Sequence, residues 1–147
     1  MTGAEGIGSR LSRAAMAAVG LALLLLTGAC ASPFERPAPL DAEPLRAVYA
    51  DDAHFRSHPF RGLQSPVGYA RWAFADEDER LVECRYGEPV AAGSRASVEW
   101  WALLRRRDGT EATLAGVSVL RFDAAGLVVE ERDYWHLLDE ARPPNFS

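Results

Sequence analysis

Three strand-length runs near the C-terminus constrain the fold of this chain more than any other feature. The runs and the turn signals between them are residues 96–105, Asp108-Gly109, residues 111–122, Asp123–Gly126 and residues 127–136. Runs of this length joined by short turns predict a meander of antiparallel strands. Both alternating faces of the middle run are largely apolar, so the sheet needs helices on one face and another cover on the second. The pattern therefore predicts an α+β domain.

The preceding residues predict one more strand and two short helices. Leu81–Tyr86 alternates like a strand, which makes Cys84 a small buried apolar residue. Ser65-Pro66 is an N-cap followed by proline at the first helical position, and the residues up to Phe74 give that helix an apolar side. A short helix of barely three turns is expected after Asp41, with Leu45, Val48 and Tyr49 on one face. The segment from His54 to His58 is expected to be extended.

The N-terminus predicts export. Arg10 and Arg13 precede an apolar run, Ala14–Leu26, that is too short to span a bilayer and has the length of a signal-peptide core. The following Leu26-Thr27-Gly28-Ala29-Cys30 resembles the lipobox of bacterial lipoproteins, which makes Cys30 the lipidated first residue of a membrane-anchored mature protein. The alternative is an ordinary secretory signal cut after Ala31. We therefore divide the chain into a signal peptide (1–29), a proline-rich tether (30–40), one domain (41–138) and a C-terminal tail (139–147).

Charge and motif content exclude several classes of protein. The formal net charge is −5 and no basic stripe exists, so nucleic acid is not an expected partner. His54 and His58 are four residues apart, which aligns ligands on a helix but not on extended chain, so no metal site is predicted. The chain has no Gly-rich phosphate loop, Cys-x-x-Cys pair or nucleophile elbow. No cofactor is therefore expected.

Several segments together resemble one known family. They are Tyr49–Phe55, Trp72–Phe74, Val98–Trp101, Ser118–Val129 and Arg132–Trp135. In order and spacing they are similar to the SnoaL-like members of the nuclear transport factor 2-like superfamily. The resemblance implies a cone, in which a strongly bent, mixed or mostly antiparallel sheet wraps around helices and leaves a deep apolar pocket. The family's long first helix would fall on residues 25–40, so we expect that helix to be short or missing.

The superfamily includes steroid isomerases, polyketide cyclases, dehydratases, epoxide hydrolases and binding modules without chemistry. Ketosteroid isomerases share the phrase at residues 49–53, but their general base is an Asp just before a Pro, where this chain has Ser57 and His58 before Pro59. Their oxyanion-binding carboxylic acid matches Ser118, and their tyrosine donor belongs to the missing helix. Steroid isomerisation is therefore not expected.

The resemblance also orients the last strand and its neighbour. It turns Glu131, Asp133 and Trp135 toward the pocket, together with Glu99, Trp101 and Leu103. A carboxylate among apolar walls is costly to ionise, so Asp133 is our candidate general acid or base, with His58 as its proton partner at the rim. Ser118 and Trp72 complete the expected lining. The alternative is that these carboxylates pair with Arg side chains across strands and only stabilise the sheet.

These observations leave three hypotheses open. The first is a domain that binds a small apolar or amphipathic molecule without turnover. The second is a lyase, isomerase or hydrolase using Asp133, and the third is an interaction domain whose interior is filled by its own side chains. Trp100 and Trp101 are adjacent, so on a strand one of them faces outward, which predicts a homodimer formed sheet to sheet.

Overall fold

The computed structural model describes residues 43–74 and 78–146. Its elements, in chain order, are the 3-10 helix η1 (Glu43–Ala47), β1 (Tyr49–Arg56), α2 (Pro66–Phe74), β2 (Glu79–Tyr86), β3 (Val90–Ala92), β4 (Arg95–Arg106), β5 (Glu111–Phe122) and β6 (Val128–Leu138). The predicted signal peptide, Cys30 and the tether lie outside the described residues. Within the described part of the chain, no helix is long and apolar enough to cross a membrane.

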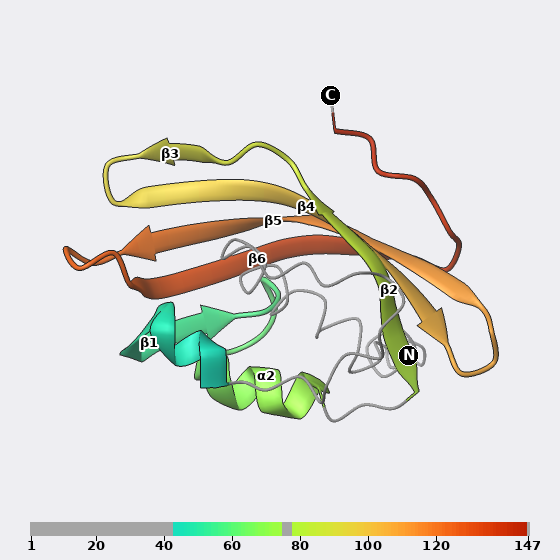
Figure 1. The fold of residues 1–147 in the computed structure, drawn as a ribbon, viewed down its shortest axis with the longest axis horizontal. Helices are drawn as coiled ribbons and strands as arrows, with labels where there is room; N and C mark the ends of the chain where they lie inside the picture. The colour runs from blue at the N-terminus through green and yellow to red at the C-terminus, as the bar shows by residue number, and fades with distance from the viewer. Residues whose placement is uncertain (1–42, 75–77, 147) are drawn as a thin grey trace, which may run out of the picture.

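The strands form one mixed sheet in the order β1-β6-β5-β4-β2, with β3 added along β4. β1 pairs with β6 in parallel, and every other pairing is antiparallel. Figure 1 shows η1, β1 and α2 gathered on one side of the long strands. This arrangement confirms the α+β class. A complete cone stays a prediction, because residues 25–40, where the family's first helix would fall, lie outside the described residues.

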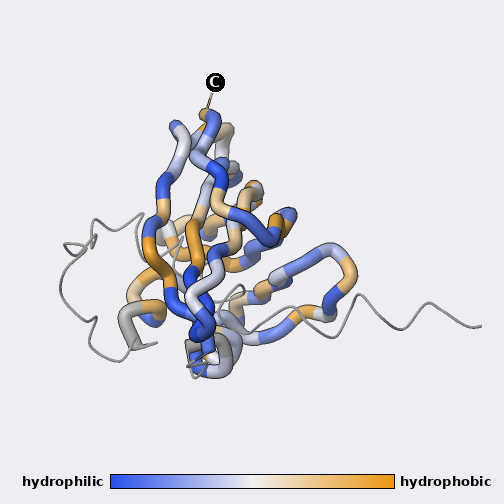
Figure 2. Tube along the Cα trace, turned by 90° about the vertical axis from the view of Figure 1, so that its right-hand side faces the viewer, coloured by the Kyte–Doolittle hydropathy of each residue, from blue (hydrophilic) through white to orange (hydrophobic). Residues whose placement is uncertain are grey.

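The prediction was closest for the meander. β5 has the predicted bounds, and the bounds of β2, β4 and β6 lie within two residues of those predicted. The second helix also begins as predicted, since the Gly68 amide donates to Ser65 Oγ at 3.3 Å. Figure 2 shows hydrophobic and hydrophilic residues following one another at short intervals along the chain, which is the kind of signal that a sequence pattern reports.

The predicted helix after Asp41 is wrong beyond its first turn. η1 has only five residues, and Tyr49 already begins β1. Pairing with β6 explains the difference, because β6 offers a row of backbone partners and the Val128 amide donates to the Val48 carbonyl at 2.9 Å. Along β1 the buried residues are Tyr49, Ala53 and Phe55. Tertiary pairing thus overrides the weak helical pattern. The short strand β3 was not predicted.

The core lies between the inner face of the sheet and the two helices η1 and α2. One cluster of buried residues contains Phe55, Tyr69, Trp100, Ala102, Leu104, Leu114 and Trp135. A second contains Leu45, Tyr49, Ala53, Ala70, Leu120 and Val128. Cys84 is half-buried against the first cluster, in keeping with the predicted apolar role.

Gly116 allows two indoles to face the core side by side. It pairs with Trp100 on β4 and with Trp135 on β6. A Cβ at this position would lie 2.6 Å from Trp135 Cβ, far inside van der Waals contact. Glycine is therefore required here because the β6 backbone at Tyr134 and Trp135 approaches closely.

The C-terminal segment covers part of the opposite, outer sheet face. Trp101 Nε1 donates to the Arg142 carbonyl at 2.8 Å, Thr113 Oγ1 donates to the Glu140 carbonyl at 2.7 Å, and the Arg142 amide donates back to Thr113 Oγ1 at 2.8 Å. Trp101 is consequently buried, with only 5% of its surface exposed. The chain therefore covers its own outer-face tryptophan.

Candidate functional site

The inner face of β6 holds two carboxyl groups and an indole. Glu131 and Asp133 are fully buried, and Trp135 is 6% exposed. Their partners across β5 are Leu120 for Glu131 and Ser118 for Asp133. Strand alternation thus places the two acids as neighbours on one face, within an otherwise apolar interior.

Each acid is held by a hydroxyl group. Ser118 Oγ donates to Asp133 Oδ1 at 2.6 Å and itself accepts from Trp100 Nε1 at 3.1 Å. Tyr49 Oη donates to Glu131 Oε2. The Trp100–Ser118–Asp133 chain fixes which oxygen of Asp133 is occupied, and the second oxygen, Oδ2, has no hydrogen-bond partner in the described structure; neither does Glu131 Oε1.

Arginine does not neutralise these carboxyl groups. Arg121 and Arg132 both pair with Glu130, which lies one residue earlier and turns away from the interior. Neither Glu131 nor Asp133 forms an ion pair with any of the described residues. The alternative in which cross-strand Arg partners neutralise Glu131 and Asp133 is therefore wrong. A buried acid pair without a cation is costly to a fold and is more typical of a site than of a scaffold.

Burial sets the protonation of the pair. Loss of hydration raises the pKa of Glu131, although the hydrogen bond from Tyr49 opposes the rise. The pKa of Asp133 is raised well above its ordinary value, first by burial and then by the neighbouring Glu131 charge. Two adjacent carboxylates cannot both ionise cheaply, so the pair retains a proton near neutral pH. Because Asp133 Oδ1 accepts from Ser118, a proton on Asp133 belongs on Oδ2, where it can be donated.

Tyr49 is the site residue that the sequence prediction missed. The sequence pattern places Tyr49 on a helix, and a helix gives no reason to expect its hydroxyl group to point at β6. Burial and Glu131 raise the pKa of Tyr49 well above its ordinary value, so it remains a hydrogen-bond donor. The alternation of Tyr49, Ala53 and Phe55 around polar residues was the available signal for a strand.

The predicted inward orientation of Glu99, Trp101 and Leu103 is wrong. Glu99 is exposed on the outer face, Leu103 is half-buried there, and Trp101 lies under the C-terminal segment. Trp100 takes the inner position, where the register sets it against Gly116 on β5. Glycine on β5 was the signal that could have fixed this orientation.

His58 and Trp72 lie at the edge of the interior. The His58 ring packs edge-on against Trp135, with centroids 5.1 Å apart, and partial burial together with Arg61 and His136 lowers its pKa. Trp135 Nε1 donates to the Ser57 carbonyl at 2.6 Å. No hydrogen bond joins His58 to Asp133 in the described structure, so its predicted role as proton partner has no direct path. Trp72 packs on Tyr69 and is 39% exposed.

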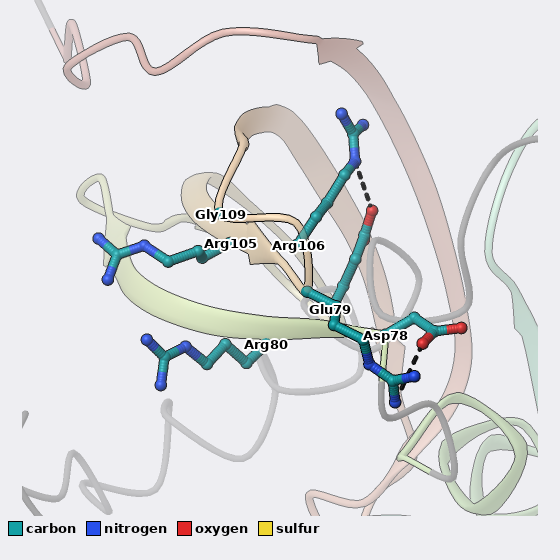
Figure 3. A pocket seen from close by; sticks show the side chains of 7 residues that line it. Asp78, Glu79, Arg80, Arg105, Arg106 and Gly109 are labelled. Atoms are coloured by element: carbon teal, nitrogen blue, oxygen red, sulfur yellow. Dashed lines mark hydrogen bonds and ion pairs between the residues drawn. The ribbon is translucent and has the colours of Figure 1, made fainter.

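The described side chains form no group of His, Cys, Asp or Glu that could hold a metal ion. One surface depression of about 320 Å³ is lined by Arg80, Arg105, Arg106 and Arg107 with Asp78 and Glu79. Arg106 pairs with Glu79 at 2.9 Å, as Figure 3 shows, and Arg107 pairs with Asp78 at 3.2 Å. Arg105 also pairs with Glu111 at 2.6 Å. Most of the positive charge of this depression is therefore compensated by carboxylates within the chain.

Comparison with known proteins agrees with this architecture. The sequence profile of the SnoaL-like domain family matches residues 36–131. This chain belongs to that family. No curated protein matches the sequence.

Solved structures of low sequence identity share the nuclear transport factor 2-like fold. One is SalBIII, an epoxide hydrolase/cyclase-like enzyme with a role in pyran ring formation in the polyether salinomycin. It is 14% identical in sequence, and the match covers 65% of this chain and 78% of SalBIII with a TM-score of 0.55. A candidate SnoaL-like polyketide cyclase from Mesorhizobium loti is 16% identical with a TM-score of 0.54, over 84% and 99%. A candidate isomerase from Rhodopseudomonas palustris is 12% identical with a TM-score of 0.51, over 63% and 75%.

Proposed function

We propose that this SnoaL-like domain binds a small apolar or amphipathic molecule in its interior, beside Glu131 and Asp133. The observation that supports this most is the pair of buried carboxyl groups with two unpartnered oxygens and no cation. A retained proton on such a pair can be donated to a carbonyl or hydroxyl oxygen of the ligand. The aromatic walls, Trp100 and Trp135, suit the apolar remainder of that molecule.

The binding test uses a matched pair of neutral probes. 2-Acetonaphthone has a carbonyl acceptor, whereas 2-ethylnaphthalene has nearly the same shape and none. We expect the ketone to bind at least about tenfold more tightly at pH 5, the worth of one buried hydrogen bond to a carboxyl group. This preference should weaken as the pH rises and the pair loses its proton. Calorimetric titration across pH 5 to 9 measures both effects.

A neighbouring carboxylate provides the control variant. Asp133→Asn and Glu131→Gln should each reduce the pH dependence of ketone binding, because each removes one titrating group. Glu130→Gln makes the same change one residue away, on the opposite face, and should leave the pH dependence as it is. Equal affinity of the two probes in the unmodified protein would contradict the proposal.

Acid–base catalysis is a second candidate function, favoured by the hydroxyl group that holds Asp133. An enzyme needs an acid or base, a group that orients it and a donor for developing charge. Asp133, Ser118 and the Tyr49–Glu131 pair are available for these roles. The names cyclase and isomerase among similar structures fit this candidate. Exchange of the methyl protons of 2-acetonaphthone with deuterated solvent, followed by NMR, would detect it, and Asp133→Asn should slow it by about 10²–10⁴-fold.

We also propose that the domain works outside the cytoplasm, attached to a membrane by a lipid on Cys30. The apolar run before Cys30 and its lipobox-like context support this. Secretion of a soluble chain is the alternative, and a homodimer formed through the outer sheet face is the assembly we propose.

A further inference from the structure

A surface hollow of about 470 Å³ lies where α2 meets the segment that follows β1. Its lining includes Arg61, Leu63, Tyr69 and Trp72. Trp72 and Leu63 are 39% and 57% exposed, and Phe60, in the same β1–α2 segment, is 93% exposed. This region therefore combines solvent-exposed apolar side chains with one arginine, unlike the charged depression beside β2 and β4.

Arg61 has no acidic partner within the described structure. Its guanidinium contacts the neutral Ser57 hydroxyl at 3.3 Å and is half-buried. By contrast, Arg105, Arg106 and Arg107 each pair with a carboxylate. A partly desolvated guanidinium facing an open hollow lacks the counter-charge that such groups usually have.

The charge of Arg61 acts on the groups around it. It contributes to the lowered pKa of His58, and it opposes the rise in the pKa of Tyr69. The acids that also face Tyr69, Glu131 and Asp133, lie in the interior. Among the described residues that line the hollow, Arg61 is the charged one and none is a carboxylate.

We propose that this hollow is a binding site for a small amphipathic carboxylate. The carboxylate pairs with the Arg61 guanidinium, and a flat apolar body packs on the exposed Trp72 and Leu63. The planar guanidinium fits a carboxylate in a two-point contact, and the indole ring provides a flat apolar surface. This site is separate from the interior proposed above and does not depend on it.

The test compares naphthalene-2-carboxylate with naphthalene-2-carboxamide, which share one shape and differ in charge. We expect the carboxylate to bind at least about tenfold more tightly at low ionic strength, and this preference to shrink as salt is added. Arg61→Gln should abolish the preference, because it removes the charge. Trp72→Ala should weaken both probes alike, because it removes the shared apolar contact. Calorimetric titration of the full chain measures each affinity.

Arg80→Gln is the matched control. Arg80 is an exposed arginine outside the hollow and has no ion pair among the described residues, so its loss should change neither affinity. If Arg61→Gln fails to fold, the salt dependence and the Trp72→Ala variant still test the site. Equal affinity of the two probes in the unmodified protein, or a charge preference that survives in a folded Arg61→Gln variant, would overturn the proposal. Neither result bears on the neutral ketone in the interior.

Discussion

Asp133 illustrates how a single residue can oppose the stability of its own fold. It is fully buried, with one oxygen held by Ser118 and the other without a partner. Its charge is unfavourable twice, through lost hydration and through Glu131 beside it. These costs support the role proposed for Asp133 toward a ligand, since an amide side chain would fit the same space without the charge.

Replacement of Asp133 by Asn tests this at the residue scale. The amide keeps an acceptor for Ser118 Oγ and removes the buried charge. We expect the free energy of unfolding at pH 8 to stay the same or rise by about 1–2 kcal/mol, while any turnover is lost. Urea unfolding monitored by circular dichroism measures the change. A clear loss of stability at pH 8 would show that the ionised carboxylate supports the sheet.

At the scale of elements, β5 determines what the inner face can hold. Gly116 and Ser118 are small, and the register sets them beside Trp100, Trp135 and Asp133. One alternating face of one strand therefore admits two indoles and positions the hydroxyl that holds the acid. The outer face of β5 has a different task, since Thr113 fastens the C-terminal segment.

Gly116→Ala should destabilise the domain by about 1–3 kcal/mol, because the added methyl group would overlap the β6 backbone at Tyr134 and Trp135. Gly68→Ala is the control, since a Cβ at that helical position meets only Ser65 at 3.7 Å, an ordinary contact. It should stabilise α2 by about 0.5–1 kcal/mol through helix propensity. Thermal unfolding measures the loss of stability expected for Gly116→Ala and the gain expected for Gly68→Ala. A stability of Gly116→Ala equal to that of the parent would contradict the packing described for β5.

At the scale of the whole molecule, the acid pair makes stability depend on pH. The pKa of Glu131 is raised to about 7, and that of Asp133 is raised as well. The folded state therefore binds more protons than the unfolded state between the ordinary carboxyl range and neutrality. The resulting stability is fully present below about pH 4 and is lost as the pH rises through the raised values.

We expect the free energy of unfolding to fall by about 2 kcal/mol or more between pH 5 and pH 8. Denaturant titrations at a series of pH values measure this, and the Asp133→Asn, Glu131→Gln double variant should flatten the profile. The ion-paired carboxylates on the surface give the opposite sign, since Arg132 and Arg121 lower the pKa of Glu130. A stability that rises with pH over this range would therefore mean that surface pairs outweigh the buried ones.

Association through the outer sheet face also belongs to the whole molecule. The dimer prediction starts from an uncovered tryptophan on the outer sheet face. That starting point is wrong, because the C-terminal segment covers Trp101. Val117, Val119 and Tyr134 remain 36–42% exposed on that face. We expect residues 33–147 to form a dimer at tens of micromolar and Val119→Arg to dissociate it, as measured by sedimentation velocity. A monomer in the unmodified protein would exclude this assembly.

Membrane attachment is tested at Cys30. A lipid on this thiol should hold the protein in the membrane fraction, and Cys30→Ala should release it with its fold intact. Fractionation followed by mass spectrometry of the mature N-terminus measures both. An unmodified Cys30, or an N-terminus at Ser32, would contradict the anchor and favour a secreted protein.

The sequence by itself determined the meander and the second helix, whereas the resemblance to the family oriented the acid-rich last strand. Turn residues and hydrophobic alternation are local signals, and they are enough to place β5 and β6 and the Ser65 cap. Tertiary structure decided the rest. β1 is a strand because β6 offers it partners, and this pairing aims Tyr49 at Glu131.

Tertiary structure also decided which tryptophan faces inward. Alternation along the strand cannot tell Trp100 from Trp101, because either one could belong to the apolar face. Only the register against Gly116 and the return of the C-terminal segment over Trp101 separate them. Orientation of a strand depends on contacts between residues far apart in the chain, and these are the contacts that one sequence read locally does not contain.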